Sequence, residues 1–123
     1  MAIPSENETW LIDIGDAVIR KQAGSGTNSL LSCEKLVHCF WVADYGMRNA
    51  GDLDVAGDVY SEFHSEGLKL ATALSLPLTQ AIFALSKDDL ENVYFDRFES
   101  ICNEIKKAWP ADAVQLRTRR KKR

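Results

Sequence analysis

The sequence predicts an all-α fold, a compact single-domain bundle of about five helices. Three observations lead to this prediction. Apolar residues recur at intervals of three and four along most of the chain, helix-capping residues precede the apolar segments, and no long segment shows the period-two alternation of a half-buried strand. A chain of 123 residues is long enough for one core, and it needs neither a disulfide framework nor a structural metal to fold.

The first helix is predicted to begin after Ser5, because Ser5-Glu6-Asn7-Glu8 has the pattern of a capping box. Its apolar face consists of Trp10, Leu11, Ile14, Val18 and Ile19. The Gly24-Ser25-Gly26 segment should end this helix and form a short loop to the next one.

The second helix is predicted to begin near Thr27 or Asn28, which are both good capping residues. Its buried stripe consists of Leu30, Cys33, Val37, Phe40 and Trp41. Asp44 continues this stripe, and Arg48, four residues later, is its predicted ion-pair partner. The Asn49-Ala50-Gly51 segment should end the helix, since Asn and Gly tolerate the left-handed conformation found at helix C-termini.

The rest of the chain is predicted to form three further helices. The third runs from about Leu53 to Leu74 as one continuous helix, with Val59, Tyr60 and Phe63 among its inward-facing residues. A short helix to Leu85 begins at Pro77, and the last long helix is capped by the segment from Ser86 and ends before Pro110. The three tryptophans, Trp10, Trp41 and Trp109, are assigned to the core.

The charge of the chain is unevenly distributed. The formal net charge is only −3, but six of the 15 basic residues lie in the last seven positions, so residues 1–116 carry a net charge of −9. We therefore divide the chain into one helical domain, residues 1–116, and a basic tail, residues 117–123, which we expect to be disordered. An acidic body of this kind repels nucleic acid and favours cationic partners.

The acidic residues are concentrated in one segment. Between Asn49 and Leu68 there are five acids and no Lys or Arg: Asp52, Asp54, Asp58, Glu62 and Glu66. In one continuous helix the last four of these would line a single face at intervals of about 6 Å. The row is interpreted as a plain solvated face or as a contact surface for a basic partner, with Asp52 adding to it at the helix start.

A third interpretation of this segment, metal binding, is disfavoured. The segment that begins at Asp52 resembles the start of an EF-hand loop, but Ala56 stands at its fifth position and Phe63 at its twelfth, where ligands are required. We therefore expect no metal and no cofactor.

Catalytic chemistry is also disfavoured. Cys33, Cys39 and Cys102 fit no metal or redox spacing, and we expect them to be buried thiols. His38 and His64 belong to no catalytic motif, although partners such as Cys33 and His38 could meet only in the fold. A small hydrolase or transferase built on these residues remains a rival interpretation.

Three short segments resemble a known family. They are Phe40–Leu53, which contains Asn49-Ala50-Gly51, then Ala71–Pro77 and Asp89–Phe95. They are similar to a small all-helical family that includes a bacterial DNA-mimic protein. Ala50 replaces the first Gly of that family's Asn-Gly-Gly, and the aromatic pair that follows it there is missing here. The resemblance implies a carboxylate surface that imitates DNA phosphates and occupies a DNA-binding protein.

The sequence thus predicts a cytoplasmic, non-catalytic acidic protein-binding module, of the DNA-mimic or toxin-immunity kind. Its partner would be a basic protein, either a DNA-binding protein or a toxin. No membrane segment is expected, since the apolar residues from Leu68 to Leu85 are interrupted by polar ones, and the N-terminus lacks the features of a secretory signal. The alternative is a nucleic-acid-associated protein that acts through the 117–123 tail. The sequence does not indicate the oligomeric state.

Overall fold

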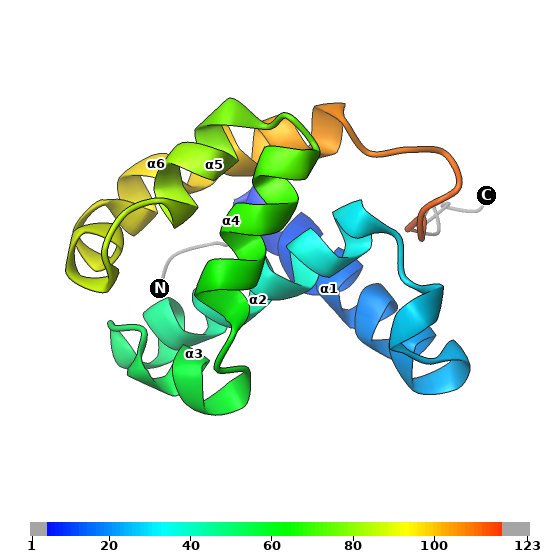
Figure 1. Cartoon of the computed structure of the whole chain (residues 1–123), viewed down its shortest axis with the longest axis horizontal. Helices are drawn as coiled ribbons and strands as arrows, with labels where there is room; N and C mark the ends of the chain where they lie inside the picture. Colours follow the sequence, from blue (N-terminus) through cyan, green and yellow to red (C-terminus); the bar gives the residue numbers. More distant parts are fainter. Residues whose placement is uncertain (1–4, 117–123) are drawn as a thin grey trace.

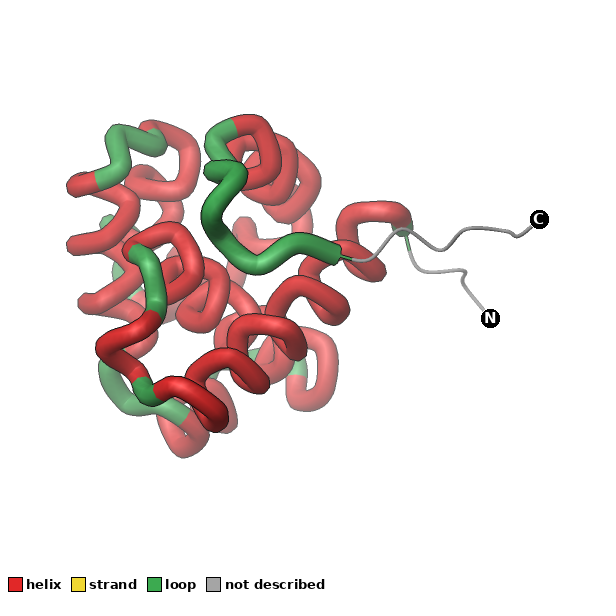
Figure 2. The backbone as a smooth tube through the Cα atoms, turned by 90° about the vertical axis from the view of Figure 1, so that its right-hand side faces the viewer, coloured by secondary structure: helices red, strands yellow, loops and turns green. Residues whose placement is uncertain are grey.

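The computed structural model describes residues 5–116, and within them the chain is helical with connecting loops (Figure 1, Figure 2). The elements are α1 (Glu6–Ser25), a short 3-10 turn η1 (Thr27–Ser29), α2 (Ser32–Ala50), α3 (Asp54–Val59), α4 (Phe63–Ala73), α5 (Pro77–Phe83) and α6 (Lys87–Lys107). No strand occurs in this range, so the predicted all-α fold is confirmed. None of the described helices is long and apolar enough to cross a membrane. The predicted tail, 117–123, lies outside the described residues.

Several helix ends follow from single residues, as predicted. The Ser5 hydroxyl accepts a hydrogen bond from the Glu8 N–H at 3.1 Å and begins α1. Gly26 and Gly51, both with positive φ, end α1 and α2. The Ser86 hydroxyl accepts from the Asp89 N–H at the start of α6. Nearby residues determine these ends, because each capping residue helps to satisfy backbone groups that the helix itself leaves unpaired.

The start of α2 differs from the prediction near Thr27 or Asn28. Residues 27–29 form the separate turn η1, and α2 begins at Ser32. Glu34 supplies the cap instead of a residue before the helix, because its carboxylate accepts a hydrogen bond from the Leu31 N–H at 2.7 Å. This contact between the third helical residue and the N-cap is local, and the same carboxylate, which is completely buried, is also bound by Lys21 and by the Val114 N–H from distant parts of the chain.

The prediction of one continuous helix from Leu53 to Leu74 is wrong. This segment instead forms two helices, α3 and α4, separated by a break at residues 60–62. Tyr60 in the break has an extended backbone, with φ −152° and ψ 97°. Both parts pack on α2: Ala56 of α3 lies against Gly46 of α2, and α4 lies across α2 (Figure 1). A straight helix of this length would extend for about 33 Å and could not turn back along α2 in this way.

Two local features of the sequence make the break inexpensive. Gly57 lies within the segment and costs about 1 kcal/mol in a helix interior relative to Ala. The continuous helix would also align four carboxylates at i,i+4 spacing, each pair costing a few tenths of a kcal/mol. One consequence is that Val59, predicted to face inward, is 51% exposed.

The core is formed by α1, α2 and α6 together with the buried faces of α3, α4 and α5. Its largest fully buried side chains include Leu11 of α1, Phe40 of α2 and Tyr94 of α6. The rings of Phe40 and Phe98 lie 5.6 Å apart. All three tryptophans are half-buried against this core rather than enclosed in it.

Candidate functional site

The five predicted acidic residues do not form a single row on one helix. Asp54 and Asp58 lie on α3, whereas Glu62 lies in the break before α4 and Glu66 lies in the first turn of α4. Asp52 precedes α3, and its side chain accepts a hydrogen bond from the Asp54 N–H at 3.0 Å. The expectation of one face with even spacing therefore fails, because the helix that would carry it is broken at Tyr60.

The surroundings of Asp54 differ from those of the other acids. Its carboxylate lies 2.8 Å from the Lys87 Nζ, and Lys87 also contacts Glu91 at 3.2 Å. Glu91 in turn accepts a hydrogen bond from the Leu53 N–H at 2.8 Å, so the start of α6 is held beside the start of α3. Hydrogen bonds to Asp54 and Glu91 raise the pKa of Lys87, which keeps this amine positively charged.

Beyond this one cation, the acidic segment is not compensated. Asp58 and Glu62 are exposed, and neither they nor Asp52 and Glu66 form an ion pair with any residue of the 5–116 range. The first turn of α6 adds two exposed acids, Asp88 and Asp89, immediately after Lys87. The α3–α4 segment and the start of α6 thus present an excess of negative charge to solvent.

An open hollow lies within this acidic region. It has a volume of about 430 Å³, and its lining includes Asp54, Asp58, Ser61, His64 and Lys87. The His64 ring stacks on the ring of Phe63, with 5.8 Å between the ring centroids. The hollow therefore combines two carboxylates and an imidazole with the Lys87 amine, and a basic side chain that enters it would pair with Asp58, the carboxylate that Lys87 does not contact.

Glu66 belongs to a different hollow, of about 260 Å³, which it lines together with Lys35, His38, Cys39 and Tyr60 among others. The rings of His38 and Tyr60 lie 5.5 Å apart. Burial lowers the pKa of His38 and so favours its neutral form. Tertiary structure, and not sequence spacing, brings Glu66 beside these groups.

The cysteines have the properties of buried thiols. Cys33, Cys39 and Cys102 are all buried and unpaired. Burial is the largest cause that raises the pKa of Cys33 to about 11 and those of Cys39 and Cys102 to about 12. The thiolate, which is the nucleophile in cysteine chemistry, is therefore disfavoured at neutral pH.

Two buried carboxylates serve the fold. Asp44 pairs with Arg48 as predicted, with the Arg48 Nε 3.0 Å from its Oδ1, and the Tyr94 hydroxyl also donates to that oxygen at 2.5 Å. No sequence pattern indicates the Tyr94 contact, because it joins residues 50 positions apart. Glu34 is bound by Lys21, on α1, at 2.8 Å.

No group of three His, Cys, Asp or Glu side chains within residues 5–116 could hold a metal ion. The segment from Asp52 to Phe63 folds as a short helix and a break, not as a calcium loop.

Comparison with known proteins identifies no relative of this chain. No family model, no curated protein and no solved structure matches this chain. The resemblance to the small all-helical family that includes a DNA-mimic protein therefore stays a prediction.

Proposed function

We propose that this protein is a non-catalytic acidic module that binds a basic surface of a partner protein, as DNA-mimic and toxin-immunity inhibitors do. The partner-binding residues would be Asp52, Asp54, Asp58, Glu62 and Glu66, here called the acidic surface. The observation that carries the proposal is the uncompensated charge of this surface, where only Asp54 has an ion-pair partner within the described chain.

Electrostatics supports a cationic partner over an anionic one. The first 116 residues carry a net charge of −9, and Lys87 is the one cation of the described structure that forms an ion pair with the acidic surface. Charges of one sign on one face accelerate the association of an oppositely charged partner, by an amount that falls as salt is added.

The broken helix changes the shape of the proposed interface. Because α3 and α4 are separate, Asp54 and Asp58 flank an open hollow, whereas Glu66 lies in another one. A partner would therefore meet a contoured surface in which a Lys or Arg side chain enters beside Asp58. Within this surface we expect Asp58 and Glu62, which are exposed, to contribute most to association.

The proposal can be tested by capture of partners from a lysate at low and moderate salt. The test variant combines Asp54→Asn, Asp58→Asn, Glu62→Gln and Glu66→Gln. A matched control neutralises four other exposed acids that form no ion pair, with Glu6→Gln, Asp13→Asn, Asp96→Asn and Asp112→Asn. A third bait lacks residues 117–123. Circular dichroism establishes that every bait is folded.

We expect a basic protein to be held by the wild type, the control and the tail deletion, and to be lost from the test variant. The purified partner should then associate more slowly with the test variant and with a weaker dependence on salt. Equal retention by the test variant and the wild type would exclude the acidic surface as the interface. Retention that is lost only with residues 117–123 would favour the alternative, a nucleic-acid-associated protein that acts through its tail.

A further inference from the structure

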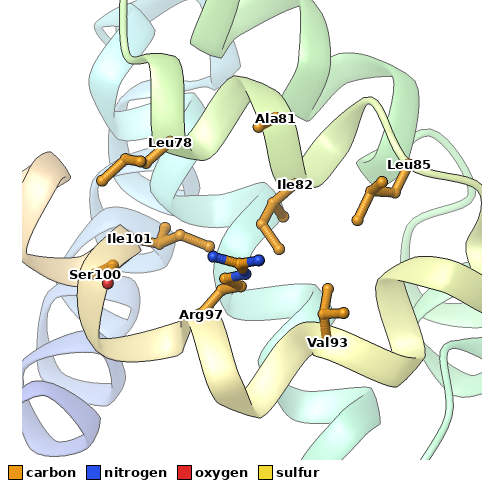
Figure 3. Close-up of a pocket in the computed structure, with 8 residues that line it drawn as sticks. All are labelled: Leu78, Ala81, Ile82, Leu85, Val93, Arg97, Ser100 and Ile101. Atoms are coloured by element: carbon orange, nitrogen blue, oxygen red, sulfur yellow. The ribbon is translucent and has the colours of Figure 1, made fainter.

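A groove between α5 and α6 has a different chemistry from the acidic surface. Its volume is about 320 Å³, which is within the range of small-molecule sites in proteins. None of the five residues of the acidic surface lines it, so this inference does not depend on the proposed function. Figure 3 shows the side chains that line the groove.

The α5 wall of the groove is entirely apolar. It consists of Leu78, Ala81 and Ile82 of α5, which lie at i, i+3 and i+4 on one face of the helix, and of Leu85 in the loop that follows α5. Ile82 is buried and forms part of the floor, whereas Leu78 is 51% exposed at the rim. Within α5 the stretch from Leu78 to Ile82 extends for about 6 Å at the rise of a helix, and Leu85 continues the wall just beyond the end of the helix. An exposed Leu over a buried apolar floor is a surface on which an apolar chain can lie.

The α6 wall brings a single charge into these apolar surroundings. It consists of Val93, Arg97, Ser100 and Ile101. Figure 3 shows the Arg97 guanidinium between the two helices, near the side chains of Ile82 and Ile101. Arg97 is the one charged residue among those that line the groove.

Arg97 has no acidic partner of its own. It forms no ion pair or hydrogen bond with any residue in the range 5–116. The positions three and four residues away on the helix are Val93, Tyr94, Ser100 and Ile101, so no acid is placed where a helix would pair it. In a chain with 18 acids the unpaired state of this guanidinium is notable, because it leaves its planar set of donors free for a ligand.

The chemistry of the ligand follows from these two walls. A guanidinium binds a carboxylate through two parallel hydrogen bonds, and the Ser100 hydroxyl offers one further donor. The apolar stripe accommodates a hydrocarbon chain of about the length of the wall, and each methylene that it removes from water favours binding. A neutral or cationic ligand would cover Arg97 without pairing it, which is unfavourable for a charge. We propose that the α5–α6 groove binds a linear aliphatic monocarboxylate of medium chain length.

The test uses octanoate as the probe and the full 123-residue chain. Octanoate, 1-octanol and octylamine are titrated separately, at concentrations below micelle formation, and the methyl resonances of the protein are followed by NMR. We expect octanoate to shift the methyl resonances of Leu78, Ile82, Leu85 and Val93. Because charge-assisted hydrogen bonds with Arg97 form only with a carboxylate, octanoate should bind about tenfold more tightly than octanol. Octylamine should bind more weakly than either.

Two variants, Arg97→Gln and Leu78→Ser, test separately what the charge and the apolar wall contribute to binding. Arg97→Gln should weaken octanoate binding by about tenfold and leave octanol binding unchanged. Lys107→Gln is the matched control, since it removes one exposed positive charge from the same helix without touching the groove, and it should leave both affinities unchanged. Leu78→Ser should weaken the binding of both probes.

Several results would overturn the proposal. They are equal affinity of the wild type for octanoate and octanol, unchanged octanoate affinity in Arg97→Gln, shifts confined to residues outside the groove, and no binding at millimolar octanoate. Groove resonances that depend on protein concentration without ligand would also overturn it, because a second copy of the chain would then occupy the groove.

Discussion

Glu34 offers the sharpest test of how this fold is held together, and the change to make is Glu34→Gln. Its side chain is completely buried. The Lys21 amine donates to both carboxylate oxygens, at 2.8 and 3.0 Å, while the Leu31 N–H donates to one of them at 2.7 Å and the Val114 N–H to the other at 2.8 Å. A single carboxylate thus joins α1, the start of α2 and the segment after α6.

The expected loss of stability can be worked out from these contacts. A glutamine side chain at this position would keep one oxygen acceptor, but its amide nitrogen would face a backbone N–H, and one buried donor left unpaired costs about 1–2 kcal/mol. The remaining oxygen could still accept from Lys21, but this hydrogen bond would no longer be assisted by a negative charge on the acceptor. Because the Lys21 side chain is 26% exposed, the loss of this charge assistance costs about 1 kcal/mol. We therefore expect the free energy of unfolding to fall by about 2–3 kcal/mol at neutral pH.

The pH dependence gives the prediction a sign. Burial by itself would raise the pKa of Glu34, but the hydrogen bonds from Lys21, Leu31 and Val114 outweigh it and hold the pKa below the ordinary value of 4.5. The ionised form is thus favoured by folding, so its contribution is present above that value and is lost as pH falls through the lower, folded pKa. The difference in the free energy of unfolding between the wild type and Glu34→Gln should therefore decrease as the pH is lowered.

The measurement is urea unfolding followed by circular dichroism, at about pH 7 and at several values down to about pH 3, since the change is expected below 4.5. Glu62→Gln is the matched control, since it removes an exposed carboxylate without an ion-pair partner in the described chain and should change stability by less than about 0.5 kcal/mol. A loss of under about 1 kcal/mol for Glu34→Gln at neutral pH, or a loss that grows on acidification, would refute the reasoning.

Two further substitutions test other parts of the fold. Asp44→Asn should show the opposite pH dependence: burial raises the pKa of Asp44 above its ordinary value of 3.8, so its stabilising contribution is largest below that value and falls as pH rises through the folded pKa. The same urea series should find this variant more destabilised, relative to wild type, at acid than at neutral pH. Gly67→Ala should lower stability by about 1–3 kcal/mol, because its new Cβ would lie 2.7 Å from the Phe83 ring where α4 packs on α5. Thermal unfolding measures this loss against Gly24→Ala, which has open space and should be neutral or slightly stabilising. Equal effects at the two glycines would contradict the packing argument.

Local residue chemistry was sufficient to predict most of the helices and their ends. Ser5 and Ser86 begin helices, and Gly26 and Gly51 end them, because each acts on backbone groups within a few residues of itself. The Asp44–Arg48 pair could be predicted for the same reason, since four residues is the spacing at which helical side chains meet.

The candidate site was predicted in composition but not in arrangement. The five acids from Asp52 to Glu66 are evident in the sequence, yet their distribution over α3, the break and α4 is not. The i,i+4 spacing of the last four acids is compatible with one continuous helix as well as with the two helices observed. The Lys87 contact with Asp54 joins residues 33 positions apart, a distance at which sequence patterns carry no information about side-chain contact.

The sequence by itself determined the all-α class, the excess of negative charge and the local helix caps, because these depend on residue type and short-range spacing. Tertiary structure decided where the third predicted helix breaks, since only the packing of α3 and α4 on the same helix, α2, requires the chain to turn at Tyr60. It also decided which polar groups became partners. Burial removed water from Glu34 and Asp44, and the free-energy cost of an unpaired buried charge required partners from distant parts of the chain.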